Sequence, residues 1–98
     1  MDFKIFQLKH EFLCDFGFRN LSDGINTVDL KRYNCVYVGK IAADGKDVNS
    51  VLEELFEIFN INHPEDFMGR SLSVSDVVML DEKYYYCCNM EWIEVKVN

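Results

Sequence analysis

The sequence has little of what most recognisable catalytic and metal sites are made from. Its four cysteines include no CxxC pair, and only two histidines, His10 and His63, accompany them. No zinc site with normal ligand spacing can be written from these residues, so we expect no metal and no other cofactor. Cys87 and Cys88 are adjacent, which in a strand would direct them to opposite faces. We interpret the cysteines as reduced, small apolar fillers and not as a disulfide framework.

Long apolar runs and catalytic motifs are also missing. No run approaches the roughly 18 apolar residues of a membrane span, and charges interrupt the opening MDFKIFQLKHEF, unlike a signal peptide. We therefore expect a cytoplasmic protein without membrane contact. No serine or cysteine has an elbow-like context, and the GxxxxGK[ST] loop is absent. The stretch His63-Pro64-Glu65-Asp66 is better explained as a turn than as a catalytic histidine with carboxylates, so we expect no enzyme.

Basic residues are scarce in the second half of the chain. Residues 1–46 carry seven basic and six acidic side chains, whereas residues 47–98 carry three basic and eleven acidic ones. Because affinity for phosphates comes mainly from lysine and arginine, we expect no direct binding of nucleic acid. The asymmetry indicates either an acidic surface that faces a partner or a charge that only confers solubility.

One stretch has a clear helical pattern. From Val48 to Phe59, apolar residues recur at the i, i+3, i+4, i+7 spacing of one face, which predicts a helix over about 47–60. Asp47 can cap its first turn, and Ser50 with Glu53 offers an alternative capping box. The proline at 64 indicates where the helix has ended.

The remaining segments are typical of strands and turns. Residues 2–9 and 33–41 suit strands, and residues 10–31 read as irregular, with one short helical turn near Leu21. From Val74 onward three short strands follow one another, with turns at residues 81–82 and 89–90. The apolar content of 49% suffices for one core. The sequence predicts a single α+β domain over residues 1–98, in which the helix packs on a mostly antiparallel sheet with a C-terminal three-strand meander.

Carboxylates and aromatic residues of the acidic half are candidates for contact with a protein partner. Carboxylates at phosphate-like spacing can imitate a nucleic-acid backbone and occupy a basic groove, and exposed aromatics anchor protein contacts. The alternative is a solvated acidic face, with the tyrosines in the core. The candidates are Glu53, Glu54, Glu57, Asp66, Asp76, Asp81, Glu82, Tyr85 and Trp92.

The stretch GRSLSVSD, residues 69–76, has the most distinctive local pattern. Arg70 with the hydroxyls of Ser71 and Ser73 is a candidate for a small anion site. The alternative is a turn in which serines cap backbone amides and Asp76 is held near Arg70 or near a backbone amide.

The C-terminal half resembles the YodL-like domain, found in small proteins and larger fusions on plasmids, integrative elements and phages of Firmicutes. The resemblance lies in FN at 59–60, HP-x-DF-x-G at 63–69, SLSVSDVV at 71–78 and the tyrosines at 84–86. Tyr37 in VYVGKI and the opening FQLK extend it over most of the chain. The family's D-S-x-G-F-like turn is replaced here by CNMEW at 88–92, so a role tied to that turn does not carry over.

The resemblance implies a mobile-element setting and no established enzymatic activity. In that setting, small acidic proteins often antagonise host defence, as anti-restriction or anti-CRISPR inhibitors do. We therefore expect a non-enzymatic protein-binding module, and we hypothesise that it inhibits a nucleic-acid-processing defence enzyme by occupying its basic groove. The alternative is an adaptor or regulatory domain that binds a host protein through an apolar-aromatic patch. A third hypothesis is an enzyme or small-ligand domain built around Arg70 and the serines. An edge strand of the meander could pair across a dimer axis.

Overall fold

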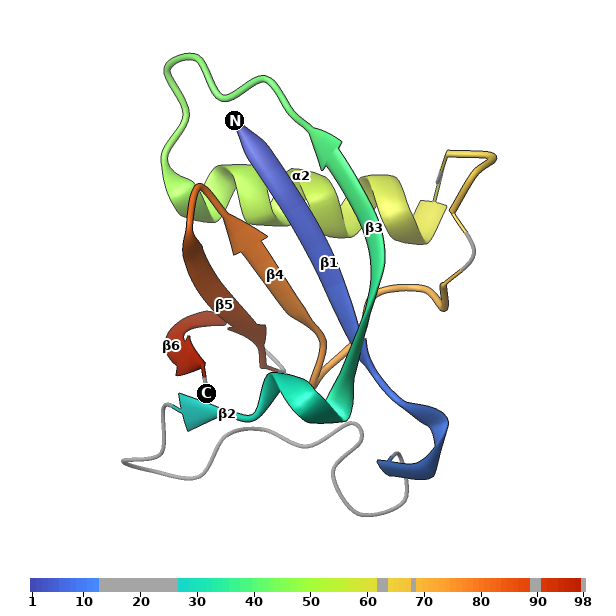
Figure 1. Cartoon of the computed structure of the whole chain (residues 1–98). Coiled ribbons are helices and arrows are strands. Elements are labelled where there is room, and N and C mark those ends of the chain that lie inside the picture. Colours follow the sequence, from blue (N-terminus) through green and yellow to red (C-terminus); the bar gives the residue numbers. More distant parts are fainter. Residues whose placement is uncertain (13–26, 62–63, 68, 89–90, 98) are drawn as a thin grey trace.

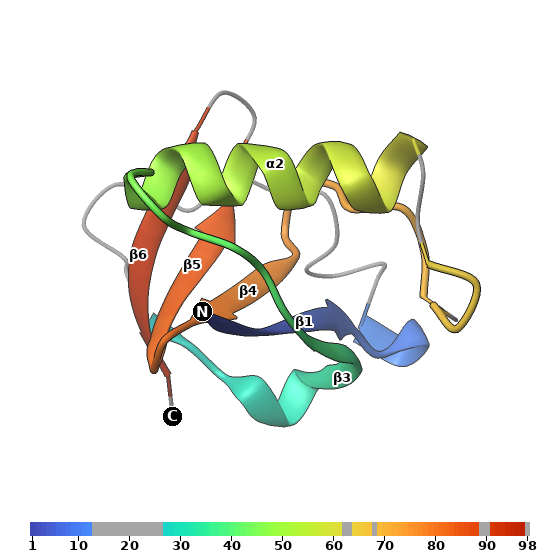
Figure 2. The same cartoon turned by 90° about the horizontal axis from the view of Figure 1, so that it is seen from above.

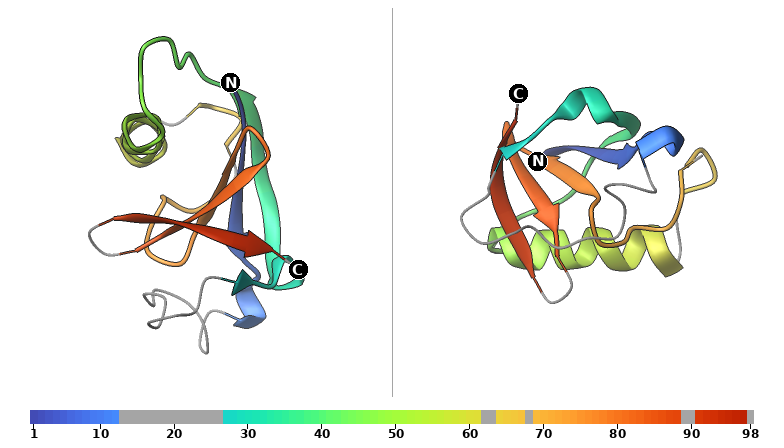
Figure 3. Two further views of the ribbon diagram at one scale, coloured as in Figure 1. Left: turned by 90° about the vertical axis from the view of Figure 1, so that its left-hand side faces the viewer. Right: turned by 90° about the horizontal axis from the view of Figure 1, so that it is seen from below.

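One long helix lies along one face of a twisted six-stranded sheet (Figures 1 and 2). The computed structural model describes residues 1–12, 27–61, 64–67, 69–88 and 91–97. Viewed end-on in Figure 3, the helix stands to one side of the sheet. The predicted α+β class, with a helix packed on a mostly antiparallel sheet, is confirmed.

The sheet joins the two ends of the chain. Its order is β2-β6-β5-β4-β1-β3, and each neighbouring pair is antiparallel except β2 with β6. The first strand, β1, lies between β3 and β4, so the N-terminal strand connects the early part of the sheet to the meander. The strands are β1 Asp2–Leu8, β2 Thr27–Val28, β3 Tyr33–Lys40, β4 Val77–Leu80, β5 Lys83–Cys87 and β6 Trp92–Val97.

The predicted strands at residues 2–9 and 33–41 and the C-terminal meander are confirmed as β1, β3 and β4–β5–β6. The interpretation of residues 10–31 as irregular is only partly right. The short 3-10 helix η1 (His10–Phe12) and the strand β2 fall within that stretch, and a second 3-10 helix, η2 (Leu30–Arg32), begins in it. The helical turn expected near Leu21 and the turn expected at Asn89-Met90 lie outside the described residues.

The helix α2 (Val48–Ile61) begins where the sequence places a cap. The backbone N–H of Ser50 donates to Oδ1 of Asp47 at 2.8 Å, so Asp47 is the N-cap and the alternative capping box is not used. The face of Val51, Leu52, Leu55 and Phe59 is buried. The 3.6-residue period of the apolar residues therefore set the face that packs on the sheet.

Aromatic rings fill the layer between α2 and the sheet. Phe59 is 1% exposed, and its ring centroid lies 4.9 Å from that of Phe67 and 5.1 Å from that of Tyr37. Phe3 packs on the same cluster from β1. Burial of rings of this size dominates the energy of a small core.

The meander is buried on both of its faces. Tyr85 belongs to the cluster under α2, whereas Tyr86 belongs to a second apolar cluster on the opposite face, with Leu8, Val28 and Tyr33 as further members. Tyr84 and Tyr86 thus share one face and Tyr85 takes the other, as strand alternation requires. The second face of the meander is covered by residues of β2 and η2, a region that the sequence pattern had predicted to be irregular.

The β4–β5 connection is the predicted two-residue turn. Asp81 and Glu82 have φ values of 51° and 75°. Positive φ at both central residues is the geometry of a type I′ hairpin turn, which matches the twist of the flanking strands. Twist of the meander therefore holds two non-glycine residues in a conformation they rarely adopt.

Candidate functional site

The loop of residues 69–76, which carries most of the distinctive sequence pattern, is fixed to β1 by one glutamine. Gln7 Nε2 donates to the carbonyl oxygen of Arg70 at 2.7 Å, and the N–H of Arg70 donates to Gln7 Oε1 at 2.9 Å. The same Nε2 donates to Oδ2 of Asp76 at 3.1 Å. One buried side chain therefore satisfies both ends of the loop.

Asp76 lies at the centre of this buried network and not on the surface. It is 0% exposed, and the N–H of Ser73 also donates to its Oδ2, at 3.0 Å. Burial raises the pKa of Asp76 to about 6, against the opposing effect of the hydrogen bonds from Ser73 and Gln7 and of the Arg70 charge. Asp76 was expected at a partner-facing surface, and its burial corrects that expectation.

The predicted anion site around Arg70 does not assemble. Arg70 Nη2 donates to the carbonyl oxygen of Leu8 at 3.3 Å, so the guanidinium turns toward the end of β1. Ser71 is exposed, and the amide of Ser73 already binds the Asp76 carboxylate. The negative charge near Arg70 comes from Asp76, and Arg70 Nη1 is buried without a hydrogen-bond partner among the described residues. The structure matches the alternative, in which this stretch is a turn with Asp76 held by a backbone amide.

Two further positions show that the 69–76 loop is built for packing. A Cβ on Gly69 would lie 2.7 Å from Gln7 Oε1 and 2.9 Å from the Phe67 ring, so no larger residue fits without displacement. Ser75 is fully buried with a φ of 87°, and its carbonyl oxygen accepts a hydrogen bond of 2.7 Å from the Tyr33 hydroxyl. The pattern that carries the family resemblance therefore determines folding more than surface chemistry.

The acidic residues expected to form one surface are distributed over separate places. Asp81 and Glu82 lie on the β4–β5 turn, in a hollow that Asp2, Lys4 and Lys40 also line. Charges of both signs mix there. Asp66 lies beside the Tyr37 hydroxyl, and burial together with this carboxylate raises the pKa of Tyr37.

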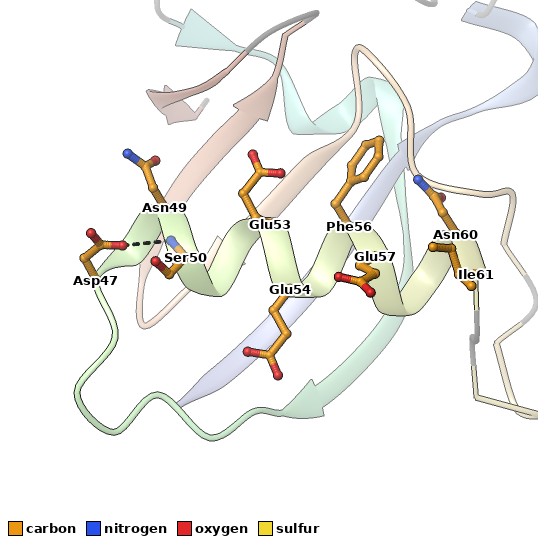
Figure 4. Close-up of a pocket in the computed structure, with 9 residues that line it drawn as sticks. All are labelled: Asp47, Asn49, Ser50, Glu53, Glu54, Phe56, Glu57, Asn60 and Ile61. Carbon is orange, nitrogen blue, oxygen red and sulfur yellow. Dashed lines mark hydrogen bonds between the residues drawn. The ribbon is translucent and has the colours of Figure 1, made fainter.

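Three glutamates line one hollow on α2. Glu53, Glu54 and Glu57 surround a shallow hollow of about 740 Å³, and Figure 4 shows Glu53 and Glu54 extending from different sides of the helix. We call these three residues the helix acidic face. Within the described chain, Lys46 forms a salt bridge with Glu54, and no salt bridge joins Glu53 or Glu57 to a basic residue. The negative charge of this face is therefore largely uncompensated.

A second hollow continues from the helix acidic face toward the meander. It has a volume of about 430 Å³, and we call it the α2–β6 groove. Trp92 is half-buried at its wall and meets Phe56 edge-on, with ring centroids 6.4 Å apart. The groove is lined by Glu53, Phe56, Leu72, Ser73, Val74, Cys87, Cys88, Glu91 and Trp92.

Two of the partner-binding candidates predicted from the sequence line the groove, and a third does not. Glu53 and Trp92 meet there, whereas Tyr85 is 8% exposed and packs under α2, so it cannot act as an exposed anchor. Phe56 and Glu91 are additions. Phe56 stands at the margin of the apolar helix face, which was a usable signal. Glu91 belongs to the carboxylates of the acidic half, but its neighbours in the groove come from distant segments.

Cys87, which lines the groove, is not an activated thiol. Burial raises the pKa of the Cys87 thiol to about 12, which keeps it protonated and unreactive at neutral pH. Cys88 is buried too. Cys35 is exposed, which corrects its interpretation as an apolar filler, and Cys14 and His63 lie outside the described residues.

Among the described residues, no group of three or more histidine, cysteine or acidic side chains could hold a metal ion. In the same part of the chain, no helix has the length and apolar character needed to cross a membrane.

Comparison with known protein families gives a match over nearly the whole chain. The model of a family described as the YodL-like domain matches residues 2–97. No curated protein and no solved structure matches the chain significantly.

Proposed function

The chain belongs to the YodL-like domain family, and we propose that it is a non-enzymatic protein-binding module that presents the helix acidic face to a basic surface of a protein partner. The observation that carries this proposal is that Glu53, Glu54 and Glu57 line one hollow of α2, where Glu53 and Glu57 are exposed.

The arrangement of these glutamates favours a binding role over simple solubility. Glu53 and Glu57 are four residues apart on one helix, and like charges at that spacing destabilise a helix. A chain that needed only solubility could interleave charges of both signs. A basic partner would supply the missing counter-charges, and the gain would be realised only in the complex.

The partner class that we propose is a nucleic-acid-processing enzyme of host defence, inhibited by a protein from a mobile element. Glu53 and Glu57 lie about 6 Å apart along the helix axis, close to two phosphate steps of about 3.4 Å on one DNA strand. The helix acidic face can therefore compete for a groove that binds a phosphate backbone. Asp76, Asp81 and Glu82 are not part of this surface, so the imitation extends over one helix only.

A second candidate function rests on the α2–β6 groove. Phe56 and Trp92 present aromatic surface beside the glutamates, which suits an adaptor or regulatory domain that binds a host protein mainly through apolar contacts. Binding of that kind would be insensitive to salt, whereas binding through the helix acidic face would weaken as salt rises.

Charge reversal with a matched control tests the proposal. The protein, its E53K/E57K variant and its D81K/E82K variant are used to capture proteins from host lysate at low and high salt. The captured proteins are identified, and the affinity is remeasured with the purified partner. Both variants change the net charge equally, but only the first alters the helix acidic face.

We expect a nucleic-acid-binding enzyme to be captured at low salt and released at high salt. E53K/E57K should weaken its binding at least tenfold, and D81K/E82K should leave it nearly unchanged. Equal losses in the two variants would contradict the proposal, since they would indicate a response to net charge alone. A partner that binds equally well in high salt would instead support the adaptor.

A further inference from the structure

We propose that the α2–β6 groove receives an arginine side chain of the protein partner, with the guanidinium against Trp92 and between the carboxylates of Glu53 and Glu91. This inference rests on the proposed function and names the chemistry that one part of the interface recognises.

The shape of the groove suits insertion of a side chain. Its floor is apolar and well packed, because Leu72 and Cys87 are each 3% exposed. Its volume of about 430 Å³ falls in the range of sites that enclose small ligands. A flat acidic surface would offer only charge, whereas this hollow can also remove apolar surface of an inserted group from water.

The aromatic wall favours a cation. Trp92 is half-buried, so part of its indole remains open to the groove, and Phe56 supports it edge-on. Figure 4 shows that Phe56 and Glu53 extend from the same side of α2, whereas Glu54 extends from another. A cation that enters beside Glu53 therefore meets the aromatic pair as well. Tryptophan is the best aromatic partner for a cation, and arginine is the cation most often found on it.

The charges at the rim define the occupant further. Glu53 and Glu91 are both exposed and line the groove, and no lysine or arginine of the described residues lines it with them. An apolar side chain would cover these carboxylates without neutralising them, which is unfavourable. An arginine supplies the charge, stacks its planar group on an aromatic ring and forms paired hydrogen bonds with carboxylates. Lysine satisfies only the first of these requirements well.

The chain carries its own reporter for this site. Trp92 is the one tryptophan in the sequence, so the intrinsic tryptophan fluorescence comes from the groove. The probe is a short acetylated and amidated peptide, Leu-Arg-Leu, titrated into the full-length protein at low salt. The same peptide with citrulline has the shape of arginine without its charge, and a third peptide carries lysine.

We expect a saturable change of the Trp92 emission with the arginine peptide, at least tenfold weaker binding of the citrulline peptide and intermediate binding of the lysine peptide. The E53Q/E91Q variant should lose the saturable change, and D81N/E82Q, with the same change of charge, should keep it. Circular dichroism and thermal unfolding verify that both variants fold. Equal responses to arginine and citrulline, or no saturable response in the folded protein, would overturn the inference.

Failure of this inference is distinguishable from failure of the proposed function. If the peptide gives no response while E53K/E57K still abolishes salt-sensitive capture of the partner, the helix acidic face binds without an inserted arginine. If the arginine peptide binds but neither charge reversal affects capture, the groove recognises arginine and the proposed partner surface is wrong.

Discussion

At the scale of single residues, Asp76 is the most informative side chain. It is buried, yet it is ionisable and accepts hydrogen bonds from Gln7 and Ser73 through one oxygen, Oδ2. Its other oxygen, Oδ1, is buried without a hydrogen-bond partner among the described residues. Charges that face it include Arg70, and the ionisable groups of Tyr33, Tyr86 and Cys87 lie near. The fold therefore holds a carboxylate that water would stabilise better than its own surroundings do.

This burial makes stability depend on pH. The pKa of Asp76 is raised from 3.8 to about 6 in the folded protein, so the folded state binds the proton more tightly than the unfolded state. The resulting stabilisation is fully present below the unfolded pKa and is lost as the pH rises through about 6. Asp76→Asn cannot titrate and keeps an oxygen acceptor for Gln7 and Ser73.

We expect the free energy of unfolding of Asp76→Asn, relative to that of the wild type, to rise between about pH 4 and pH 7, by about 2–3 kcal/mol at about 1.4 kcal/mol per pKa unit. Urea unfolding at several pH values measures this difference, with the exposed Glu65→Gln as control. Parallel pH profiles of Asp76→Asn and the wild type would show that this carboxylate does not titrate differently on folding.

At the scale of elements, the 69–76 loop ties β1 to the start of the meander. Its hydrogen bonds join residues more than 60 positions apart in sequence, Gln7 with Arg70 and Asp76. Gly69 allows this close approach, because a Cβ there would lie 2.7 Å from Gln7 Oε1. A small substitution at Gly69 therefore acts on the contact between two distant elements.

Gly69→Ala should destabilise the protein by about 1–3 kcal/mol, as overpacking of a close contact does. Either Gln7 or the Phe67 ring must move, and the N–H of Arg70 then loses part of its protection. Thermal unfolding measures the first effect, and hydrogen exchange of the Arg70 amide measures the second. Ser71→Ala, an exposed change two residues away, is the control. Wild-type exchange at Arg70 in Gly69→Ala would show that the Gln7 contact does not depend on this glycine.

The sheet has two open edges in the part of the chain that the structure describes. Within the described residues, β4 and β5 are interior strands, and β2 pairs with the end of β6. The strand β3 is open along its length, with Val38 63% exposed, and β6 is open over residues 92–95, which β2 does not reach. A shift of register between Ile5 and Phe6 interrupts the β1–β3 ladder. Such irregularities and the charged Lys40 at the strand end oppose pairing with another edge.

At the scale of the whole molecule, stability and binding make opposite demands on the helix acidic face. In the isolated protein, Glu53 and Glu57 repel each other across one turn of α2. In the proposed complex, the same charges meet a basic surface. A substitution that relieves the repulsion should therefore strengthen the fold and weaken the function.

Glu57→Lys tests this opposition. The new lysine follows Glu53 by four residues and Glu54 by three, and an i, i+4 pair in this orientation adds about 0.2–0.5 kcal/mol of stability at low salt. We expect a slightly higher melting temperature together with weaker capture of the partner. Glu82→Lys provides the same change of charge away from α2. A gain in stability without any loss of binding would place the partner surface elsewhere on the molecule.

Features that depend on neighbouring residues could be predicted from the sequence alone. The helix was predicted at about 47–60 and lies at 48–61, because an apolar period and the cap at Asp47 are local signals. The meander and its turn at Asp81-Glu82 followed from short β-rich segments between polar breaks. The two-residue strand β2 is too short to have a period, so it was missed.

Which of these residues reach the surface together depends on the three-dimensional fold. Asp76 and Tyr85 are residue types that are common in binding surfaces, but contacts from β1 and α2 bury them. Gln7, which binds Asp76, lies 69 positions away in the sequence. Glu53 and Trp92 meet only because α2 lies across the meander. The solvent exposure of a residue and its spatial neighbours depend on segments that are distant in sequence. A local sequence pattern does not show which segments these are.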